Sequence, residues 1–229
     1  MSDLVKASKD VQEIKKKKLH IAFVLDETGS MHSIKNDTVG GYNEYVNTVR
    51  QTQPTALFTL VKFNSMRVFK VYRNVPMRHI RPMKHEDYQP AGATPLIDAV
   101  VNAIHVAEEE EAGDAGVAVV VLTDGEENCS TEFDSSFLRR LIGEKRRQGW
   151  LFTFLGADLD AFKQARVFGF DWRNTISFSG EDTKDAFAAS ARATLSYAAT
   201  GDAASATYTQ DERDSVHEDE VLRLAKGTK

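Results

Sequence analysis

The sequence predicts an α/β fold: a doubly wound, mostly parallel six-stranded sheet with one antiparallel edge strand and helices on both faces. Two continuous apolar runs, LHIAFVLD at 19–26 and GVAVVVLTD at 116–124, are typical of strands buried on both faces. Segments with helical signals separate the strands along the chain, as they do in sheets covered on both sides. Together these observations indicate an open, doubly wound sheet.

Shorter extended runs supply the other four strands. Residues 56–64 and 66–73 are joined by "NS", which is too short for a crossover helix but suits a tight hairpin. One strand of this pair is therefore antiparallel, and we expect it at the edge of the sheet. The runs 149–157 and 174–179 complete the set.

Five segments have apolar residues at helical spacing or helix-end signals. Pro95 stands at a first-turn position of the second segment, whereas Asp134 is an N-cap residue for the third and Gly149 ends it. We predict helices at residues 34–52, 95–111, 134–149, 158–169 and 181–200.

The composition suits one main domain. The chain has 229 residues, of which 41% are hydrophobic and 28% charged, enough for one substantial core. We expect an N-terminal extension at 1–17, a domain at 18–200 and a polar C-terminal tail or peripheral arm at 201–229, with a short helix at 216–226. The sequence contains no internal repeat.

The charge distribution argues against nucleic acid and anionic membranes as partners. The formal net charge is −5, whereas phosphate binding usually requires a concentrated basic surplus. The one basic run, KKKK at 15–18, is interpreted as a solvated lead-in to the first strand.

We expect no targeting or membrane-spanning segment from these residues. The first ten residues are charged where a signal peptide is apolar, and no apolar run approaches the roughly 18 residues of a membrane span. The single cysteine, Cys129, cannot form an internal disulfide. We therefore expect a cytoplasmic protein, whose oligomeric state the sequence leaves open.

Oxygen-bearing side chains lie at the ends of both central strands and before one helix. Asp26 ends the first strand and Asp124 the other, Thr28 and Ser30 follow the first, and Thr94 precedes the helix at 95–111. Each of them alone is also typical of a cap or a turn. Because the carboxyl ends of parallel strands meet at one edge, we expect these loops to converge. Such hard oxygen donors suit Mg²⁺ or Mn²⁺, and the usual histidine and cysteine sets for zinc are missing.

Three motifs carry a resemblance to a known family. D-x-T-G-S-M at 26–31, G-x-T-P-L at 92–96 and T-D-G at 123–125 resemble the three parts of the metal-ion-dependent adhesion site (MIDAS) of von Willebrand factor A (vWA) domains. Through the order of strands and helices, the resemblance extends over about residues 18–200. It implies the vWA, or Rossmann-like, fold.

The resemblance also implies a ligand set. Thr28 and Ser30 would bind the metal directly, Thr94 directly or through water, and Asp26 and Asp124 mainly through water. With uncharged hydroxyls as its nearest ligands, a divalent ion keeps much of its charge and can accept an acidic side chain from a partner protein. The expected function is thus metal-dependent protein–protein interaction, without enzymatic activity. The neighbouring acids Glu27, Glu126 and Glu127 are expected to face solvent.

Two alternatives remain open at this point. DETGS and TDGEEN also resemble motifs of aspartyl-phosphate enzymes of the haloacid dehalogenase superfamily, with Asp26 as nucleophile and Asp124 holding Mg²⁺. Glu27 in place of lysine, and Thr28 where soluble phosphatases have an acid, argue against that reading. The other alternative is a vWA scaffold whose metal site serves local stability only.

Overall fold

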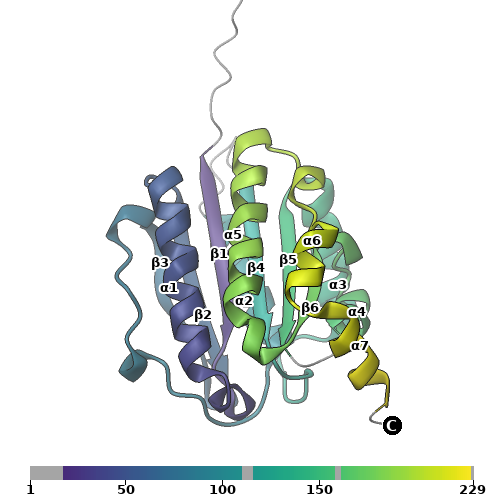
Figure 1. The fold of residues 1–229 in the computed structure, drawn as a ribbon. Coiled ribbons are helices and arrows are strands. Elements are labelled where there is room, and N and C mark those ends of the chain that lie inside the picture. Colours follow the sequence, from purple (N-terminus) through teal and green to yellow (C-terminus); the bar gives the residue numbers. More distant parts are fainter. Residues whose placement is uncertain (1–17, 110–115, 158–160, 228–229) are drawn as a thin grey trace, which may run out of the picture.

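The computed structural model describes residues 18–109, 116–157 and 161–227, and the described chain contains one six-stranded sheet of order β3-β2-β1-β4-β5-β6 (Figure 1). All neighbouring strands are parallel except β2 and β3, so the antiparallel strand lies at an edge. The strands are β1 (Leu19–Asp26), β2 (Leu57–Asn64), β3 (Arg67–Pro76), β4 (Gly116–Thr123), β5 (Leu151–Ala157) and β6 (Thr175–Phe178). The predicted fold class is confirmed.

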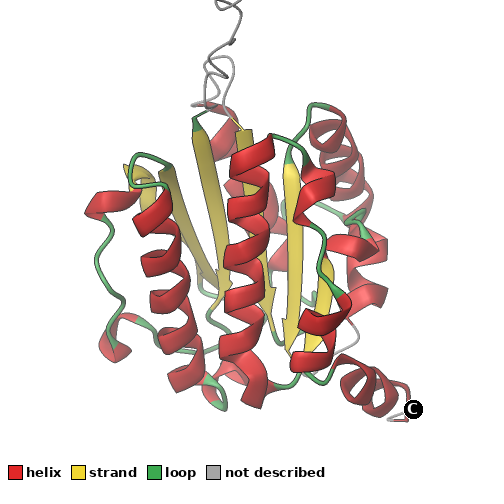
Figure 2. Cartoon of the chain, turned by 45° about the horizontal axis from the view of Figure 1, so that its top comes forward, coloured by secondary structure: helices red, strands yellow, loops and turns green. Residues whose placement is uncertain are grey.

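Helices cover both faces of this sheet (Figure 2). Side chains of α1 and α5 belong to the core on one face, and those of α2, α3 and α4 to the core on the other. The helices are α1 (Lys35–Thr52), α2 (Leu96–Glu109), α3 (Ser135–Arg147), α4 (Ala161–Phe168), α5 (Thr183–Thr200), α6 (Gln210–Ser215) and α7 (Glu218–Gly227). The predicted helical positions 110–111 and 158–160 lie outside the described residues.

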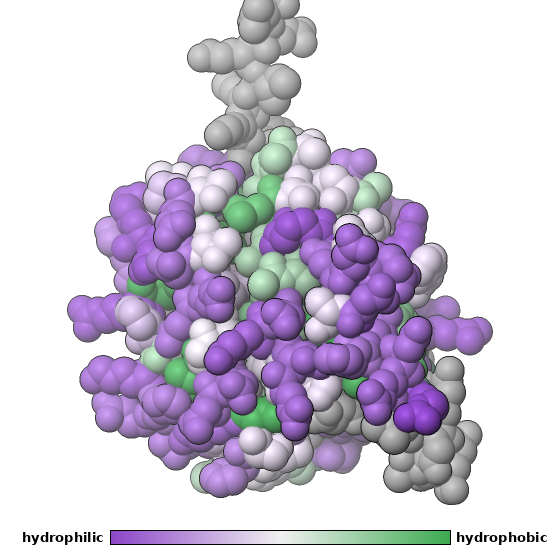
Figure 3. Space-filling view, viewed as in Figure 1, coloured by the Kyte–Doolittle hydropathy of each residue, from purple (hydrophilic) through white to green (hydrophobic). Residues whose placement is uncertain are grey.

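The continuous apolar run of β1 follows from burial on both sides. Ile21 and Phe23 point toward α1 and α5, whereas Ala22 and Val24 point toward α2. The Phe23 ring stacks on Phe187 of α5, with 6.0 Å between the ring centroids. The solvent side of the α1 and α5 layer is largely hydrophilic, with small apolar areas (Figure 3).

The order of strands creates a crevice at the carboxyl end of β1. The chain continues from β1 to β2 on one side, while β4 pairs with β1 on the other. Leu25 pairs with Leu122, so Asp26 and Thr123 follow side by side. This reversal of direction is where open α/β sheets bind ligands.

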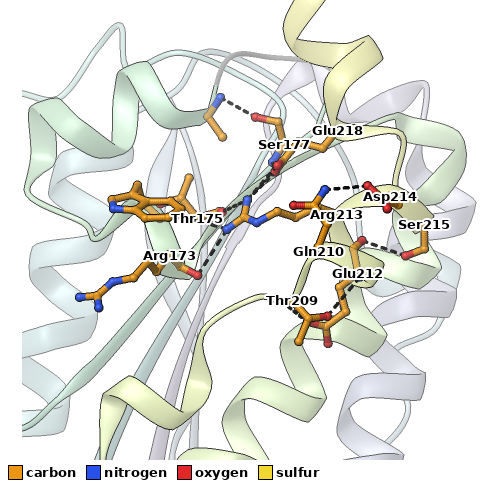
Figure 4. Close-up of polar contacts among 12 residues, drawn as sticks. Arg173, Thr175, Ser177, Thr209, Gln210, Glu212, Arg213, Asp214, Ser215 and Glu218 are labelled. Carbon is orange, nitrogen blue, oxygen red and sulfur yellow. Dashed lines mark hydrogen bonds and ion pairs between the residues drawn. The ribbon is translucent and has the colours of Figure 1, made fainter.

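The C-terminal segment is more closely packed than a tail. Arg213 of α6 is buried, forms a 2.8 Å ion pair with Glu218 of α7 and donates to the Thr175 carbonyl of β6 (Figure 4). Glu218 in turn accepts the Ser177 N–H at 3.0 Å. Residues of this segment also join the core beside α5, namely Ala206, Tyr208 and Val216. The short helix predicted at 216–226 is present as α7, α6 was not predicted, and the domain division at residue 200 stays a prediction.

Membrane-spanning helices are not found in the described part of the chain. None of its helices is both long enough and apolar enough to cross a bilayer.

Candidate functional site

Asp26 is the centre of the site and is held on both carboxylate oxygens. The residue is fully buried, its Oδ1 accepts the Thr28 N–H at 2.7 Å, and its Oδ2 accepts the Thr123 hydroxyl at 2.5 Å. The Tyr88 hydroxyl donates to the backbone carbonyl of Asp26. These bonds fix the orientation of the carboxylate before any ligand is present.

The two loops that follow the central strands meet through side-chain oxygens. The Ser30 hydroxyl, in the loop after β1, donates to Asp124 Oδ1, in the loop after β4, at 2.6 Å. The Thr28 and Ser30 hydroxyl oxygens are 3.3 Å apart. Thr28 is buried whereas Ser30 is exposed, so the group opens to solvent on the Ser30 side.

Thr94 brings the third loop to the same place. A Cβ atom at Gly125 would lie 3.1 Å from Thr94 Oγ1 and 3.7 Å from Ser30 Oγ, so glycine allows these hydroxyls to approach the loop closely. The Thr94 N–H donates to the side-chain oxygen of Asn128 at 2.8 Å, and the Asn128 N–H donates back to the Thr94 carbonyl.

Backbone hydrogen bonds lock the loop before α2 to the loop after β1. The Gly29 N–H donates to the Gly92 carbonyl at 3.0 Å, and the Ala91 N–H donates to the Glu27 carbonyl at 3.0 Å. The structure therefore brings all five predicted site residues together at one edge of the sheet.

The donor set fits a hard divalent cation. Two carboxylates and three hydroxyls converge, and these are ligands that Mg²⁺ and Mn²⁺ accept. Within the described ranges, no group of three or more His, Cys, Asp or Glu side chains could hold a metal ion. A cation at this site would therefore depend on the hydroxyls as well as on Asp26 and Asp124.

Burial sets the charge behaviour of Asp26. Desolvation raises the pKa of Asp26 from 3.8 to about 7, although hydrogen bonds from Thr123 and Thr28 act in the opposite direction, and the charge of Asp124 adds to the rise. A positive charge nearby would favour the ionised carboxylate. A bound cation would therefore stabilise the ionised form of Asp26, which burial alone disfavours.

Glu27 does not face solvent, which makes its predicted exposure wrong. It is buried, forms a 2.6 Å ion pair with Lys62 of β2 and accepts the Gln89 N–H at 2.7 Å. Lys62 also donates to the Asp87 carbonyl and lies 4.8 Å from the centroid of the Phe69 ring. The pair therefore pins the segment that leads to Gly92 and Thr94. A lysine inside a largely apolar strand was the signal that could have revealed it.

Glu127 is also structural, again against the prediction. It accepts the N–H groups of Ile97, Cys129 and Ser130 at 2.7–2.9 Å and so ties the loop after β4 to the start of α2. Glu126 does face solvent, with its side chain 72% exposed, as predicted.

Sequence reasoning missed two further supports of the site. Gln164 of α4 donates to the Gly125 carbonyl at 3.2 Å and accepts the Glu127 N–H at 3.0 Å. Tyr88 holds the Asp26 backbone from the segment before α2. Neither lies in a recognisable motif, and both become visible only when the chain is folded.

No protein-family description matches the chain, and no curated protein matches it either. Several solved structures are similar to the chain. The vWF domain of the type V pili tip protein Mfa5 from Porphyromonas gingivalis has a TM-score of 0.59 at 9% identity, covering 77% of this chain and 95% of that one. The pilus adhesin SpaC from Lactobacillus rhamnosus GG has a TM-score of 0.64 at 12% identity, covering 79% of this chain and 30% of the adhesin.

Proximal thread matrix protein 1 from the mussel byssus is a third neighbour, with a TM-score of 0.56 at 16% identity. The match covers 78% of this chain but only 46% of the mussel protein, so the chain corresponds to less than half of it. A further structure of that protein has a zinc-occupied MIDAS motif. Identities this low support a statement about the fold alone. The chain has the vWA fold.

Proposed function

We propose that this chain is a metal-dependent protein-interaction module. A Mg²⁺ or Mn²⁺ ion held by Asp26, Thr28, Ser30, Thr94 and Asp124 would bind an acidic side chain of a partner protein. The observation that carries this proposal is the 2.6 Å contact between Ser30 and Asp124, which joins the loops after both central strands. A pilus adhesin and a matrix protein among the structural neighbours support an interaction role.

The burial of each residue indicates its role in the site. Asp26 and Thr28 are buried and held by neighbouring hydrogen bonds, so they form the floor. Ser30 is exposed and Asp124 is partly exposed, so a partner's side chain would approach from their side. When bound, a divalent cation with mostly uncharged direct ligands supplies enough positive charge to attract a carboxylate.

The phosphatase alternative is poorly supported by the surroundings of Asp26. An aspartyl nucleophile needs a carboxylate oxygen free to attack a phosphoryl group. Both Asp26 oxygens are engaged, by the Thr28 N–H and the Thr123 hydroxyl, and the residue is fully buried. We therefore propose a non-enzymatic role.

Calorimetry on matched serine variants separates docking from a purely structural metal site. Ser30→Ala removes a proposed ligand, whereas Ser33→Ala removes an exposed hydroxyl on the same turn that donates to the Ser30 carbonyl. Mg²⁺, Mn²⁺ and Zn²⁺ are each titrated into the wild type and both variants.

If the site docks a partner, Ser30→Ala should bind Mg²⁺ and Mn²⁺ at least about tenfold more weakly than the wild type does. Its melting temperature in EDTA should stay close to that of Ser33→Ala. Equal affinity for metal in all three proteins would contradict the ligand set. Metal binding that raises the melting temperature of the wild type but never strengthens binding of a carboxylate peptide would favour a structural site instead.

A further inference from the structure

Two adjoining cavities lie away from the Asp26–Asp124 site, near the amino ends of β5 and β6. They have volumes of about 490 and 550 Å³ and share Gly143 and Arg146 of α3. Trp150, just before β5, lines the first, and Trp172, just before β6, lines the second. Each volume lies in the range that binds a ligand or a partner's side chains.

Arginine is the most frequent residue in the lining of each cavity. Asp171 is the single acidic side chain among their described lining residues, and it binds Arg146 at 2.7 Å and Arg173 at 2.8 Å. The second cavity is also lined by Arg139 of α3 and Arg166 of α4. For neither guanidinium group is an ion pair or side-chain hydrogen bond found within the described ranges. This is a locally positive surface on a chain whose formal net charge is −5.

Apolar side chains accompany these guanidinium groups. Trp172 is 66% exposed at the second cavity, and the neighbouring Val167 of α4 is 47% exposed. Phe162 and Phe170 line the same cavity. Exposed tryptophan beside arginine is the combination enriched at the energetic centres of protein interfaces.

The backbone that presents Trp172 is held firmly. Arg213 of the C-terminal arm donates to the carbonyls of Trp172 and Arg173 at 3.3 and 3.4 Å. The side chain of Arg173 itself points away from Arg213 (Figure 4). Gly169 has φ +91°, and a Cβ there would lie 3.3 Å from the Arg139 carbonyl oxygen. Glycine thus lets the chain turn tightly against α3 before reaching Trp172.

We propose that this surface, the α3–α4 groove lined by Arg139, Arg146, Phe162, Arg166 and Trp172, docks an acidic segment of a partner protein that carries an apolar side chain. Arg139 and Arg166 would pair with the acidic residues of the partner, and Phe162 and Trp172 would contact its apolar side chain. Nucleic acid fits less well, because the formal net charge of the chain is −5 and Asp171 pairs with two of the lining arginines. This interaction needs no metal and is independent of the function proposed above.

Panning a random dodecapeptide phage library against the immobilised full chain tests the proposal. EDTA is kept present so that the Asp26–Asp124 site cannot capture acidic peptides through a cation. Enriched peptides are then synthesised, and their affinity for the wild type and for each variant is measured by calorimetry. The variants are Arg139→Ala, Arg166→Ala and Trp172→Ala, with Arg140→Ala as control, since Arg140 is exposed on α3 but stacks on Phe137.

We expect acidic peptides with an aromatic or aliphatic residue, whose affinity falls at least about tenfold in each of the three groove variants and less than about twofold in Arg140→Ala. The three substituted residues are exposed, so the variants should fold, and circular dichroism of each variant checks this. Enrichment of peptides without net negative charge, or binding equally strong in the groove variants, would overturn the proposal. So would failure to enrich any peptide, or tighter binding of a labelled oligodeoxythymidine through the same arginines.

Discussion

The Ser30 hydroxyl lies 2.6 Å from Asp124 Oδ1, although 94 residues separate the two in sequence. This contact links the ends of β1 and β4 at the crevice where the chain order reverses. Gly125, directly after Asp124, also lies against the Thr94 hydroxyl. The close approach of three loops, more than any single residue, defines the proposed metal site.

Gly125→Ala is expected to weaken metal binding while leaving the fold intact. The new Cβ would lie 3.1 Å from Thr94 Oγ1 and so push one proposed ligand away from Ser30. We predict a loss of about tenfold in Mg²⁺ affinity by calorimetry. Gly143→Ala is the control, because its Cβ would meet only an Arg147 side-chain atom at 3.9 Å and it lies within α3. That variant should keep its affinity and gain up to ~1 kcal/mol in stability. Equal affinity in the two variants would contradict the role of the Gly125 contact.

Asp26 is expected to make the metal-free protein less stable as the pH rises. Its pKa is about 7 in the folded protein against an ordinary value of 3.8, so the folded state holds a proton that the unfolded state releases between these values. The free energy of unfolding should therefore fall as the pH rises from about 4 to about 7, by up to ~1.4 kcal/mol per pH unit from this group. Urea denaturation in EDTA measures it.

The matched variant is Asp26→Asn, which keeps the shape but cannot ionise. The difference in stability between wild type and variant should move in favour of the variant across that pH range. A difference that stays constant from pH 5 to pH 8 would show that Asp26 titrates normally.

The buried Glu27–Lys62 pair should be strongly coupled. Lys62→Met would leave the Glu27 carboxylate buried without its cation, and we expect a loss of about 3–5 kcal/mol in the free energy of unfolding. Glu27→Gln combined with Lys62→Met should recover much of that loss, because no unpaired charge remains. Urea denaturation of the two single variants and the double variant completes the cycle. Simple additivity of the single losses would show that the two residues act independently.

The C-terminal arm should contribute to global stability. Arg213→Met removes the buried partner of Glu218 and the bonds to the Thr175, Trp172 and Arg173 carbonyls. The expected loss is about 3–5 kcal/mol. Arg223→Ala serves as the control, because its pair with Glu220 is exposed on both sides and should be worth less than ~1 kcal/mol. A cost for Arg213→Met no larger than that of the control would mean that the arm packs loosely.

The sheet could be predicted from the sequence because strands buried on both faces have a recognisable apolar pattern. β1 and β4 lie between two helical layers, so their residues are apolar without alternation, and the short connection before β3 admits only a hairpin. The same logic placed Asp26 and Asp124 at strand ends. The loops could then be expected to meet, because parallel strands end at one edge.

The parts that sequence reasoning missed depend on pairings between distant residues. Glu27 resembles any loop acid until β2 places Lys62 beside it. Helix α6 lacks the apolar stripe by which a sequence predicts a helix. It is held instead by the ion pair between Arg213 and Glu218 and by the bond from Arg213 to the Thr175 carbonyl. Gln164 supports the Gly125 loop from α4, some 39 residues away. Such contacts are specified by the fold, and composition or periodicity does not reveal them.

Reciprocal linkage between metal and carboxylate is the most direct test of metal-gated docking. The Mg²⁺ affinity of the wild type is measured by calorimetry with and without a short glutamate peptide, and the peptide affinity is measured with and without Mg²⁺. We predict that each ligand strengthens the other by the same factor, as linkage requires, and that Asp26→Ala abolishes the effect. Metal binding that is unchanged by the peptide, or peptide binding that is equally strong in EDTA, would contradict it.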